Sequence, residues 1–346
     1  MAENPLSADL DMVLRRTRPI WEDLRGRRLF VTGGTGFFGC WLLETFAWAN
    51  ERCGLGAEML VLTRKLDAFR AKAPHLAERK DIQFHQGSVE NFTFPAGEFS
   101  HIIHAATDNT ADEWGLYQSI VSGTQRALEF AGSCKAKKFL LTGSGAVYGT
   151  QPSDLTHVGE DYQGAPDVSK LTLASARGEG KRVAELLCAR YGSRFGVETK
   201  IARCFAFIGP YMPLDSYLAI GNFIGDVLAG RPIQIKGDGT PFRSYLYMAD
   251  LAAWLWTILI RGTSNRPYNV GSSHALTIAE TAQTVARVLG GNTRVIIAQK
   301  PKPNQPAQHY VPNINRAAEE LDLDQWTQLE DAIRATAAWH RQNRAG

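Results

Sequence analysis

The chain has 346 residues, of which 44% are hydrophobic and 21% charged, and its formal net charge is +3. This composition is typical of a globular protein with one large domain or two joined ones, and the near balance of charge argues against a nucleic-acid partner. The five cysteines form no CxxC pair and the eight histidines show no ligand spacing, so we expect a cytoplasmic protein without disulfides or metal. Because no signal-length or membrane-spanning apolar run occurs, we expect no membrane association.

Residues 8–24 have apolar positions at helical spacing, and Pro19 is expected to limit or kink that helix. From Arg28 onward, short β-rich runs alternate with helical stretches. We predict strands over 28–34, 58–64, 82–87, 101–106, 138–144 and 200–210, and helices over 41–50, 66–79, 123–134, 222–230 and 250–262. This alternation predicts a Rossmann-type α/β fold with a doubly wound parallel sheet.

Three consecutive segments are expected from this pattern. Residues 1–26 form a helical extension, and residues 27–200 form the dinucleotide-binding domain. Residues 201–346 form a smaller α/β region, with some elements packing back on the Rossmann domain.

The first predicted strand ends in TGGTGFFG, with glycines 33, 36 and 39 at the spacing GxxGxxG. Glycines in such a turn let the backbone approach a pyrophosphate, and the following helix N-terminus offers free N–H groups to it. A cofactor is therefore expected to contact Gly33, Thr35, Gly36, Phe37, Phe38 and Gly39. The second predicted strand ends in Thr63, Arg64 and Lys65 with no acid, which favours NADP over NAD.

With these motifs in order, the chain resembles an extended short-chain dehydrogenase/reductase of the NAD-dependent epimerase/dehydratase family, which acts on nucleotide sugars. The stretches HIIHAAT, LLTGSGAVYG, RCFAFIGP, GDGTPFRSYLYMADLA and YNVGS resemble family motifs over about residues 27–325. The resemblance implies further cofactor contacts at Ser88, Val89, Ala105, Ala106 and Thr107. It also implies that residues 201–346 mainly bind the nucleotide-sugar substrate. The expected substrate contacts are Ser144, Tyr148, Tyr211, Asn222 and Arg243.

The same resemblance implies a catalytic Ser/Thr and a Tyr-x-x-x-Lys pair. Ser144 corresponds to the residue that orients the sugar hydroxyl, and Lys181 to the lysine that holds the nicotinamide ribose. The family tyrosine, which exchanges the proton of sugar O4, corresponds to Arg177. Arginine has a pKa above about 12 and only donates hydrogen bonds, so it cannot accept that proton.

Three explanations for Arg177 stay open at this point. Its side chain points into solvent in a silenced site, it pairs with a phosphate of substrate or cofactor, or it is an introduced substitution. Tyr148, Tyr211, His157 and Glu160 are the other residues considered for proton transfer, each more simply interpreted as a packing or surface residue.

Gly145 and Ala146 follow Ser144 where family dehydratases have Asp and Glu, and decarboxylases keep the Glu. We therefore expect an NAD(P)-dependent nucleotide-sugar epimerase or 4-ketoreductase that transfers hydride at sugar C4. The alternatives are a weakly active or inactive binding homologue and, ranked last, a dehydratase or decarboxylase. The family habit of pairing through helices implies a homodimer.

Overall fold

The computed structural model describes residues 4–108, 111–216, 218–291, 293–304 and 306–344. The chain folds into two compact units, each built from several segments. Unit 1 comprises residues 1–149, 164–204 and 252–268, and unit 2 comprises residues 150–163, 205–251 and 269–346. The boundaries proposed from the sequence are contiguous, whereas the chain passes between the units several times, once within a helix at Leu251 and Ala252.

A seven-stranded sheet in the order β11-β6-β5-β4-β1-β2-β3 organises unit 1. Its strands are β1 (Arg28–Thr32), β2 (Glu58–Thr63), β3 (Ile82–Gln86), β4 (His101–His104), β5 (Lys138–Thr142), β6 (Glu198–Cys204) and β11 (Pro267–Val270). The pairs from β3 to β6 are all parallel. The predicted doubly wound sheet is therefore confirmed.

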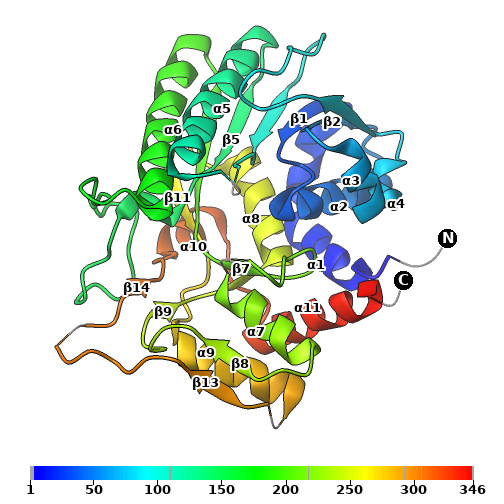
Figure 1. Ribbon diagram of the computed structural model, residues 1–346. Coiled ribbons are helices and arrows are strands. Elements are labelled where there is room, and N and C mark those ends of the chain that lie inside the picture. The colour runs from blue at the N-terminus through cyan, green and yellow to red at the C-terminus, as the bar shows by residue number, and fades with distance from the viewer. Residues whose placement is uncertain (1–3, 109–110, 217, 292, 305, 345–346) are drawn as a thin grey trace. The chain divides into compact units, whose positions relative to one another are not determined.

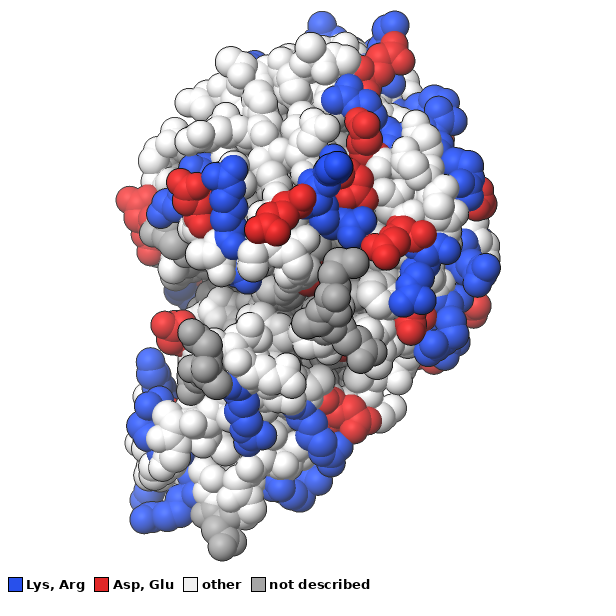
Figure 2. All heavy atoms as spheres, turned by 90° about the vertical axis from the view of Figure 1, so that its right-hand side faces the viewer, with Lys and Arg blue, Asp and Glu red and all other residues white. Residues whose placement is uncertain are grey.

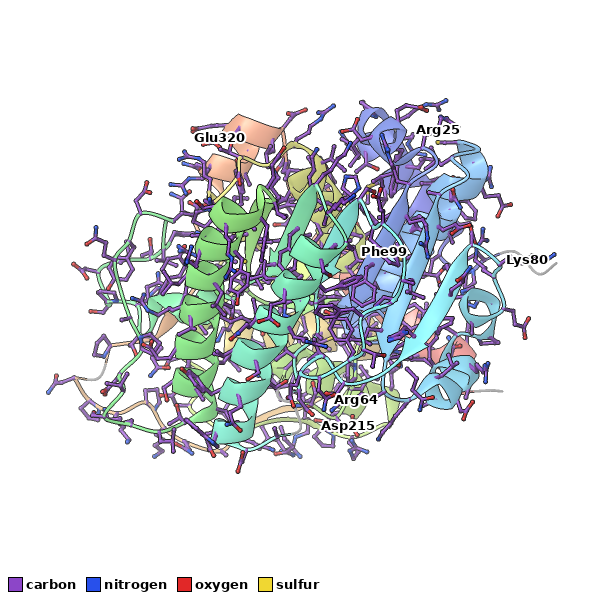
Figure 3. All side chains as sticks on the ribbon, turned by 90° about the horizontal axis from the view of Figure 1, so that it is seen from above. Arg25, Arg64, Lys80, Phe99, Asp215 and Glu320 are labelled. Atoms are coloured by element: carbon purple, nitrogen blue, oxygen red, sulfur yellow. The ribbon has the colours of Figure 1, made fainter. Side chains whose placement is uncertain are left out.

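The helices of unit 1 cover both faces of this sheet. They are α1 (Ser7–Thr17), the 3-10 helix η1 (Arg18–Leu24), α2 (Phe37–Arg52), α3 (Leu66–Lys72), α4 (Pro74–Ala77), α5 (Glu113–Ser133), the 3-10 turn η2 (Gly145–Tyr148), α6 (Leu173–Phe195) and most of α8 (Met248–Arg261). Because crossovers are right-handed, helices that lead to strands on opposite sides of β1 lie on opposite faces. Figures 1 and 3 show α5 and α6 side by side along one face.

Each face has its own apolar core. Under α5 and α6, the ring of Phe30 packs between those of Phe99, labelled in Figure 3, and Phe130, at centroid distances of 5.9 and 4.7 Å. In the other group, Trp21 of η1 contacts Trp256 of α8 at 5.0 Å, and the Trp256 indole donates to Thr45 of α2. The N-terminal helices are thus packed into unit 1.

Proline positions explain where two expected helices divide. The helix expected over 8–24 becomes a 3-10 helix at Arg18, with Pro19 in its first turn. The helix expected over 66–79 is split at Ala73, because the following residue is Pro74.

Unit 2 consists of short strands and helices. They are β7 (Phe207–Ile208), α7 (Ala219–Leu228), β8 (Ile233–Ile235), β9 (Phe242–Arg243), β10 (Leu246–Tyr247), β12 (Leu276–Thr277), α9 (Ile278–Val285), the π-helical turn η3 (Ala286–Gly290), β13 (Val295–Ile297), β14 (His309–Tyr310), α10 (Asn315–Leu321) and α11 (Leu329–Arg344). The strands pair as β7 with β10, β8 with β13, and β9 between β12 and β14. The expected strand over 200–210 is divided between β6 and β7.

The surface carries both signs of charge in close mixture. On the face shown in Figure 2, Lys and Arg side chains are interspersed with Asp and Glu, in keeping with the small net charge. None of the described helices is both long and apolar enough to cross a membrane.

Candidate active site

The glycine loop between β1 and α2 has the geometry of a dinucleotide cradle. Gly33 has φ of +73°, and a Cβ on it would lie 2.6 Å from the backbone of Ala105 and Ala106. A Cβ on Gly39 would collide with the backbone of Gly33 and Gly34. Gly36 is the N-cap of α2 and is exposed, so the first turn of the helix is open to an anion. The loop therefore fits the pyrophosphate of a dinucleotide.

The other expected cofactor residues of unit 1 lie where parallel strands end. Ala105 and Ala106 follow β4, and their N–H groups donate to the carbonyl and hydroxyl oxygens of Thr32 at the end of β1. Thr107 follows them, and its hydroxyl donates a hydrogen bond to the Ala106 carbonyl. Phe37 and Phe38, which are both half-buried, begin α2. Carboxyl ends of parallel strands are where such sheets bind ligands.

At the end of β2, the Thr63 and Thr35 hydroxyls lie 3.4 Å apart. Arg64, which follows Thr63, donates to Asp108 at 2.6 Å. The Lys72 ammonium of α3 donates to the Thr35 carbonyl at 3.2 Å. The structure thus adds Lys72 and Asp108, which the sequence analysis missed, to this corner of the site.

Ser88 and Val89 follow β3. The Ser88 carbonyl accepts from the N–H groups of Asn91 and Phe92, so this residue anchors a turn. A Cβ on Gly123 of α5 would lie 2.9 Å from the Val89 side chain, so Val89 packs closely on that helix. The expected contact of these residues with the cofactor remains a proposal.

Ser144, Arg177 and Lys181 are connected by the packing of α6 on η2. Ser144 caps η2, and its hydroxyl accepts from the Ala146 N–H at 3.2 Å. A Cβ on Gly178 of α6 would lie 2.5 Å from the Ala146 carbonyl oxygen, so only glycine allows this approach. Arg177 precedes Gly178, which places it on the turn of α6 that meets η2.

Lys181 is almost fully buried one helical turn after Arg177. Its ammonium donates to the Thr142 carbonyl at 2.7 Å, two residues before Ser144. Burial, followed by the charge of Arg177, lowers the pKa of Lys181 to about 8. Burial is thus the main cause of the lowered pKa, and the Arg177 charge adds to it.

His104 is a buried polar residue to which the sequence analysis assigned no role, although it lies in the HIIHAAT stretch. One ring nitrogen contacts the Thr32 hydroxyl at 2.8 Å and the other the Thr124 hydroxyl at 3.1 Å. Burial, with a smaller contribution from Lys181, lowers the pKa of His104 to about 3. Neutral His104 thus ties β1, β4 and α5 together beneath the cofactor loop.

Tyr148 lies inside unit 1 and is not exposed to solvent. Its side chain is buried, and its hydroxyl accepts from Arg203 at 2.8 Å. Arg203 also forms a two-pronged ion pair with Glu185, at 2.9 and 2.7 Å. This network, which the sequence analysis missed, gives Tyr148 a structural role, and its substrate contact remains a proposal.

The expected substrate residues of unit 2 are well anchored. Tyr211 has φ of +69° and packs on Trp339 at 4.8 Å, and Asn222 of α7 exchanges two hydrogen bonds with the backbone of Ser216. The Arg243 guanidinium, whose pKa is lowered by burial, donates to the Phe242 carbonyl and lies 5.8 Å from the Tyr310 ring.

Two buried polar atoms near Arg243 lack a hydrogen-bond partner among the described residues. They are the hydroxyl oxygen of Ser244, which directly follows β9, and Nδ1 of His309, on the paired strand β14. Buried polar atoms normally find partners, so these atoms are candidates for contact with a ligand.

The other residues considered for proton transfer have structural partners. His157 Nε2 donates to the Ser273 carbonyl at 2.9 Å. Glu160 accepts from the Asn269 N–H at 2.8 Å and lies 3.9 Å from Arg316. Within the described part of the chain, no group of three or more His, Cys, Asp or Glu could hold a metal ion.

Comparisons of the sequence and of the structure with known proteins agree on one family. The sequence model of the NAD dependent epimerase/dehydratase family matches residues 29–271. The chain is 32% identical to UDP-glucuronic acid decarboxylase 3 of Arabidopsis thaliana, over 88% of this chain and 86% of the relative. It is 28% identical to UDP-glucuronic acid decarboxylase 1 of the same organism, over 88% and 68%. Among solved structures, UDP-glucuronic acid 4-epimerase from Bacillus cereus in complex with UDP-glucuronic acid and NAD superimposes with a TM-score of 0.76, at 21% identity over 91% and 99%.

Proposed function

Since the chain belongs to the NAD dependent epimerase/dehydratase family of nucleotide-sugar enzymes, we propose that it decarboxylates a UDP-linked uronic acid through hydride transfer at sugar C4. The observation that carries this proposal is the 32% identity to UDP-glucuronic acid decarboxylase 3 over most of both chains. The sequence analysis ranked decarboxylation last among the possible activities, whereas the similarity to UDP-glucuronic acid decarboxylases now favours it.

The absence of acidic residues after Ser144 is compatible with decarboxylation. Oxidation of C4 removes a hydride from C4 and the proton from O4, which leaves to solvent because Arg177 cannot accept it. It places a ketone β to the carboxylate carried by C5. When the bond from C5 to the carboxylate breaks, CO₂ leaves and the electron pair moves to the C4 oxygen as an enolate. A solvent proton then returns to C5, so neither Gly145 nor Ala146 needs to transfer one.

The chain's own residues have separate roles in this scheme. The glycine loop and Lys181 would hold a nicotinamide cofactor, which when bound would supply the hydride acceptor and donor for C4. Ser144 orients the O4 hydroxyl and Lys181 holds the nicotinamide ribose, as the family resemblance implies. Arg177 donates hydrogen bonds to the C4 oxygen, whose negative charge develops as CO₂ leaves.

Arg177 favours a second candidate, reduction of a substrate that is already a 4-ketone. Oxidation of a C4 hydroxyl releases a proton that a permanently charged guanidinium cannot accept. Reduction of a 4-ketone creates an alkoxide, which a guanidinium stabilises. The chain would then complete a reaction that another oxidising enzyme begins.

One experiment separates these candidates. Purified protein is incubated with UDP-glucuronic acid and oxidised cofactor, and in parallel with a UDP-4-keto-pentose and reduced cofactor, with mass spectrometry and NMR of the products. Release of CO₂ from the uronic acid supports decarboxylation. Turnover of the ketone alone supports reduction, and inversion at C4 without CO₂ supports epimerisation. Binding of cofactor and UDP-sugar without any product supports the inactive homologue.

The nucleotide is proposed to bind through unit 2. Arg243 offers a planar guanidinium suited to a diphosphate. The unpartnered polar atoms belong to Ser244, the next residue along the chain, and to His309 on the paired strand β14. Tyr211 and Asn222 remain proposed substrate contacts of the same unit.

For the cofactor we propose a preference for NADP over NAD. Arg64 and Lys65 follow Thr63 at the end of β2, where enzymes that use NAD have an acid for the ribose hydroxyls. The five thiols are free, as expected for the proposed cytoplasmic location.

We also propose a homodimer formed through α5 and α6. Exposed apolar side chains favour this arrangement: Leu173, Leu186 and Phe195 of α6 have exposed fractions of 47%, 68% and 40%. Analytical ultracentrifugation of Leu186→Lys tests it, because a charge there should shift the sedimentation toward the monomer.

A further inference from the structure

One of the two-stranded sheets of unit 2 consists of β8 and β13, which run parallel (Figure 1). Within the described residues, β13 pairs with no other strand. Its backbone faces β8 through the Arg294 carbonyl, which accepts from the Ile233 N–H at 2.9 Å. At the other end the Ala298 N–H donates to the Ile235 carbonyl, also at 2.9 Å. One side of β13 is therefore occupied by β8, and the other side is an edge of the sheet.

That edge of β13 offers backbone groups for pairing. Successive residues of a strand direct their N–H and C=O groups to opposite sides, so those of Val295 and Ile297 face away from β8. The Ile297 side chain is apolar and 45% exposed, and the residues at 294 and 298 on either side of the strand are exposed as well. An accessible edge of this kind is a template for another strand.

The charges around this edge are basic. Arg294 directly precedes β13, and Lys300 follows it. Lys236 directly follows β8, where its carbonyl accepts from the Gln299 side chain at 3.1 Å. All three cations are exposed, and none of them forms an ion pair with a described residue. An acidic side chain placed beside this edge would therefore be attracted by cations that have no competing partner.

The acids of the same sheet region are already engaged elsewhere. Asp226 of α7 pairs with Arg231 at 2.8 Å. Its carboxylate also lies 3.4 Å from the Gln234 N–H, which places it on the side of β8 that faces away from β13. Asp238 accepts from the N–H and the hydroxyl of Thr240, at 3.0 and 2.9 Å. The positive charge at the β13 edge is thus available to a partner.

The same charges oppose a second copy of the chain. Antiparallel pairing of two β13 strands centred on Ile297 would set Arg294 of each copy opposite Lys300 of the other. Like charges directly opposite one another destabilise a strand pair, whereas carboxylates at those positions would stabilise it. We propose that β13 accepts an extended acidic segment of a partner protein as a further strand, through backbone hydrogen bonds to Val295 and Ile297. This interaction is independent of the proposed catalytic function.

Peptide binding to the full chain tests the proposal. The probe is a fluorescein-labelled peptide of alternating glutamate and valine, followed by fluorescence polarisation. It should bind, and its twin of alternating lysine and valine should not. A second twin, methylated on every backbone nitrogen, keeps the carboxylates but cannot donate backbone hydrogen bonds. It should bind about tenfold more weakly or worse. Added salt should weaken the acidic peptide as well, because the cations are exposed.

Two variants separate the backbone edge from the charges. Ile297→Pro removes the outward N–H and leaves the ladder to β8 in place, so it should weaken the acidic peptide about tenfold or more at an unchanged melting temperature. Arg294→Glu combined with Lys300→Glu should transfer the preference to the lysine–valine peptide. The matched control Arg190→Glu reverses an exposed charge on α6 and should bind like the wild type.

Amide hydrogen exchange gives a signature of strand addition. Exchange at Val295 and Ile297 should slow when the acidic peptide binds, whereas Ile296, whose backbone groups face β8, should not change. Equal binding of the methylated twin, or undiminished binding to the double charge reversal, would overturn the proposal, as would no binding of the acidic peptide. Should Ile297→Pro fail to fold, the charge reversal and the methylated twin still decide. A wild-type dimer that Ile297→Pro converts to monomer would assign the edge to a second copy and also overturn the proposal.

Discussion

Arg177 and Lys181 lie one turn apart on α6, and burial together with the Arg177 charge lowers the pKa of Lys181 to about 8. Both positions matter because α6 meets η2, the turn capped by Ser144, through the close approach of Gly178. The family resemblance implies a proton-accepting tyrosine and a lysine at these two positions.

Replacing Arg177 by tyrosine should restore that arrangement. Arg177→Tyr creates Tyr-x-x-x-Lys with Lys181, so oxidation of a C4 hydroxyl should accelerate by about 10²–10⁴-fold. Reduction of a 4-ketone should change less, because that direction needs no proton acceptor. Initial rates in both directions measure the effect. Arg190→Tyr, an exposed position farther along α6, is the control, and an equal gain there would contradict the explanation.

The lowered pKa of Lys181 predicts a specific dependence of stability on pH. Between about pH 8 and the unfolded pKa near 10.5, the unfolded chain keeps a Lys181 proton that the folded chain has lost, so the Lys181 contribution to the free energy of unfolding should rise with pH. The buried thiols of Cys40 and Cys134, whose pKa values burial raises to about 11, contribute in the opposite sense, so the Lys181 contribution is the difference between the pH profiles of the wild type and Lys181→Met. The rise should be of the order of 1–3 kcal/mol. Urea denaturation from pH 7 to 10.5 measures it. Lys181→Met should lose this slope, and Arg177→Gln should begin it at higher pH; an unchanged slope in Lys181→Met would assign it to other groups.

A second pH effect should arise in the opposite sense at His75. Its hydrogen bond to the buried Glu44 carboxylate raises the pKa of His75 above the ordinary value of 6.5. The resulting stabilisation is fully present below about pH 6.5 and is lost as pH rises through the folded pKa. Melting temperatures from pH 6 to 8.5 should show this loss in the wild type. His75→Gln should flatten that part of the profile, whereas the exposed Arg70→Ala should retain it.

Two glycine substitutions distinguish the effect of a steric clash from the effect of backbone strain alone. Gly33→Ala adds a Cβ 2.6 Å from the Ala105 backbone at φ of +73°, so it should abolish cofactor binding and strongly lower the melting temperature. Gly54→Ala introduces a similar φ of +57° with open space around the new Cβ. It should cost only about 1 kcal/mol and leave cofactor affinity intact. Equal effects would mean that strain alone explains both.

In unit 2, Arg243 should determine nucleotide affinity. Arg243→Ala should weaken UDP binding by about tenfold to a hundredfold, and Arg243→Lys should recover part of it, because lysine keeps the charge without the planar fork. Isothermal titration with UDP measures both. Arg231→Ala, which removes an exposed cation paired with Asp226, should bind UDP normally.

The sequence predicted β1 to β6 of unit 1 and the glycine loop because both depend on local patterns, whereas β11 was not among the predicted strands. The apolar run that contains Phe30 and Val31 can be recognised directly in the sequence, and so can the glycine at position 33, whose φ is +73°. The approach of Gly178 to Ala146 and the contact of Lys72 with Thr35 join residues more than 30 positions apart, so no local pattern reveals them. Arg203 lies in a quoted motif, yet its pairing with Glu185 and Tyr148 emerges only when β6, α6 and η2 meet.

Hydride transfer at sugar C4 is the central claim, and isotope transfer tests it most directly. The protein is incubated with a UDP-4-keto-pentose and NADPH that carries deuterium on the transferring carbon of its nicotinamide, and the sugar is examined by NMR. The account predicts deuterium at C4 of the product sugar. Deuterium at another carbon, or a product formed without deuterium, would contradict it.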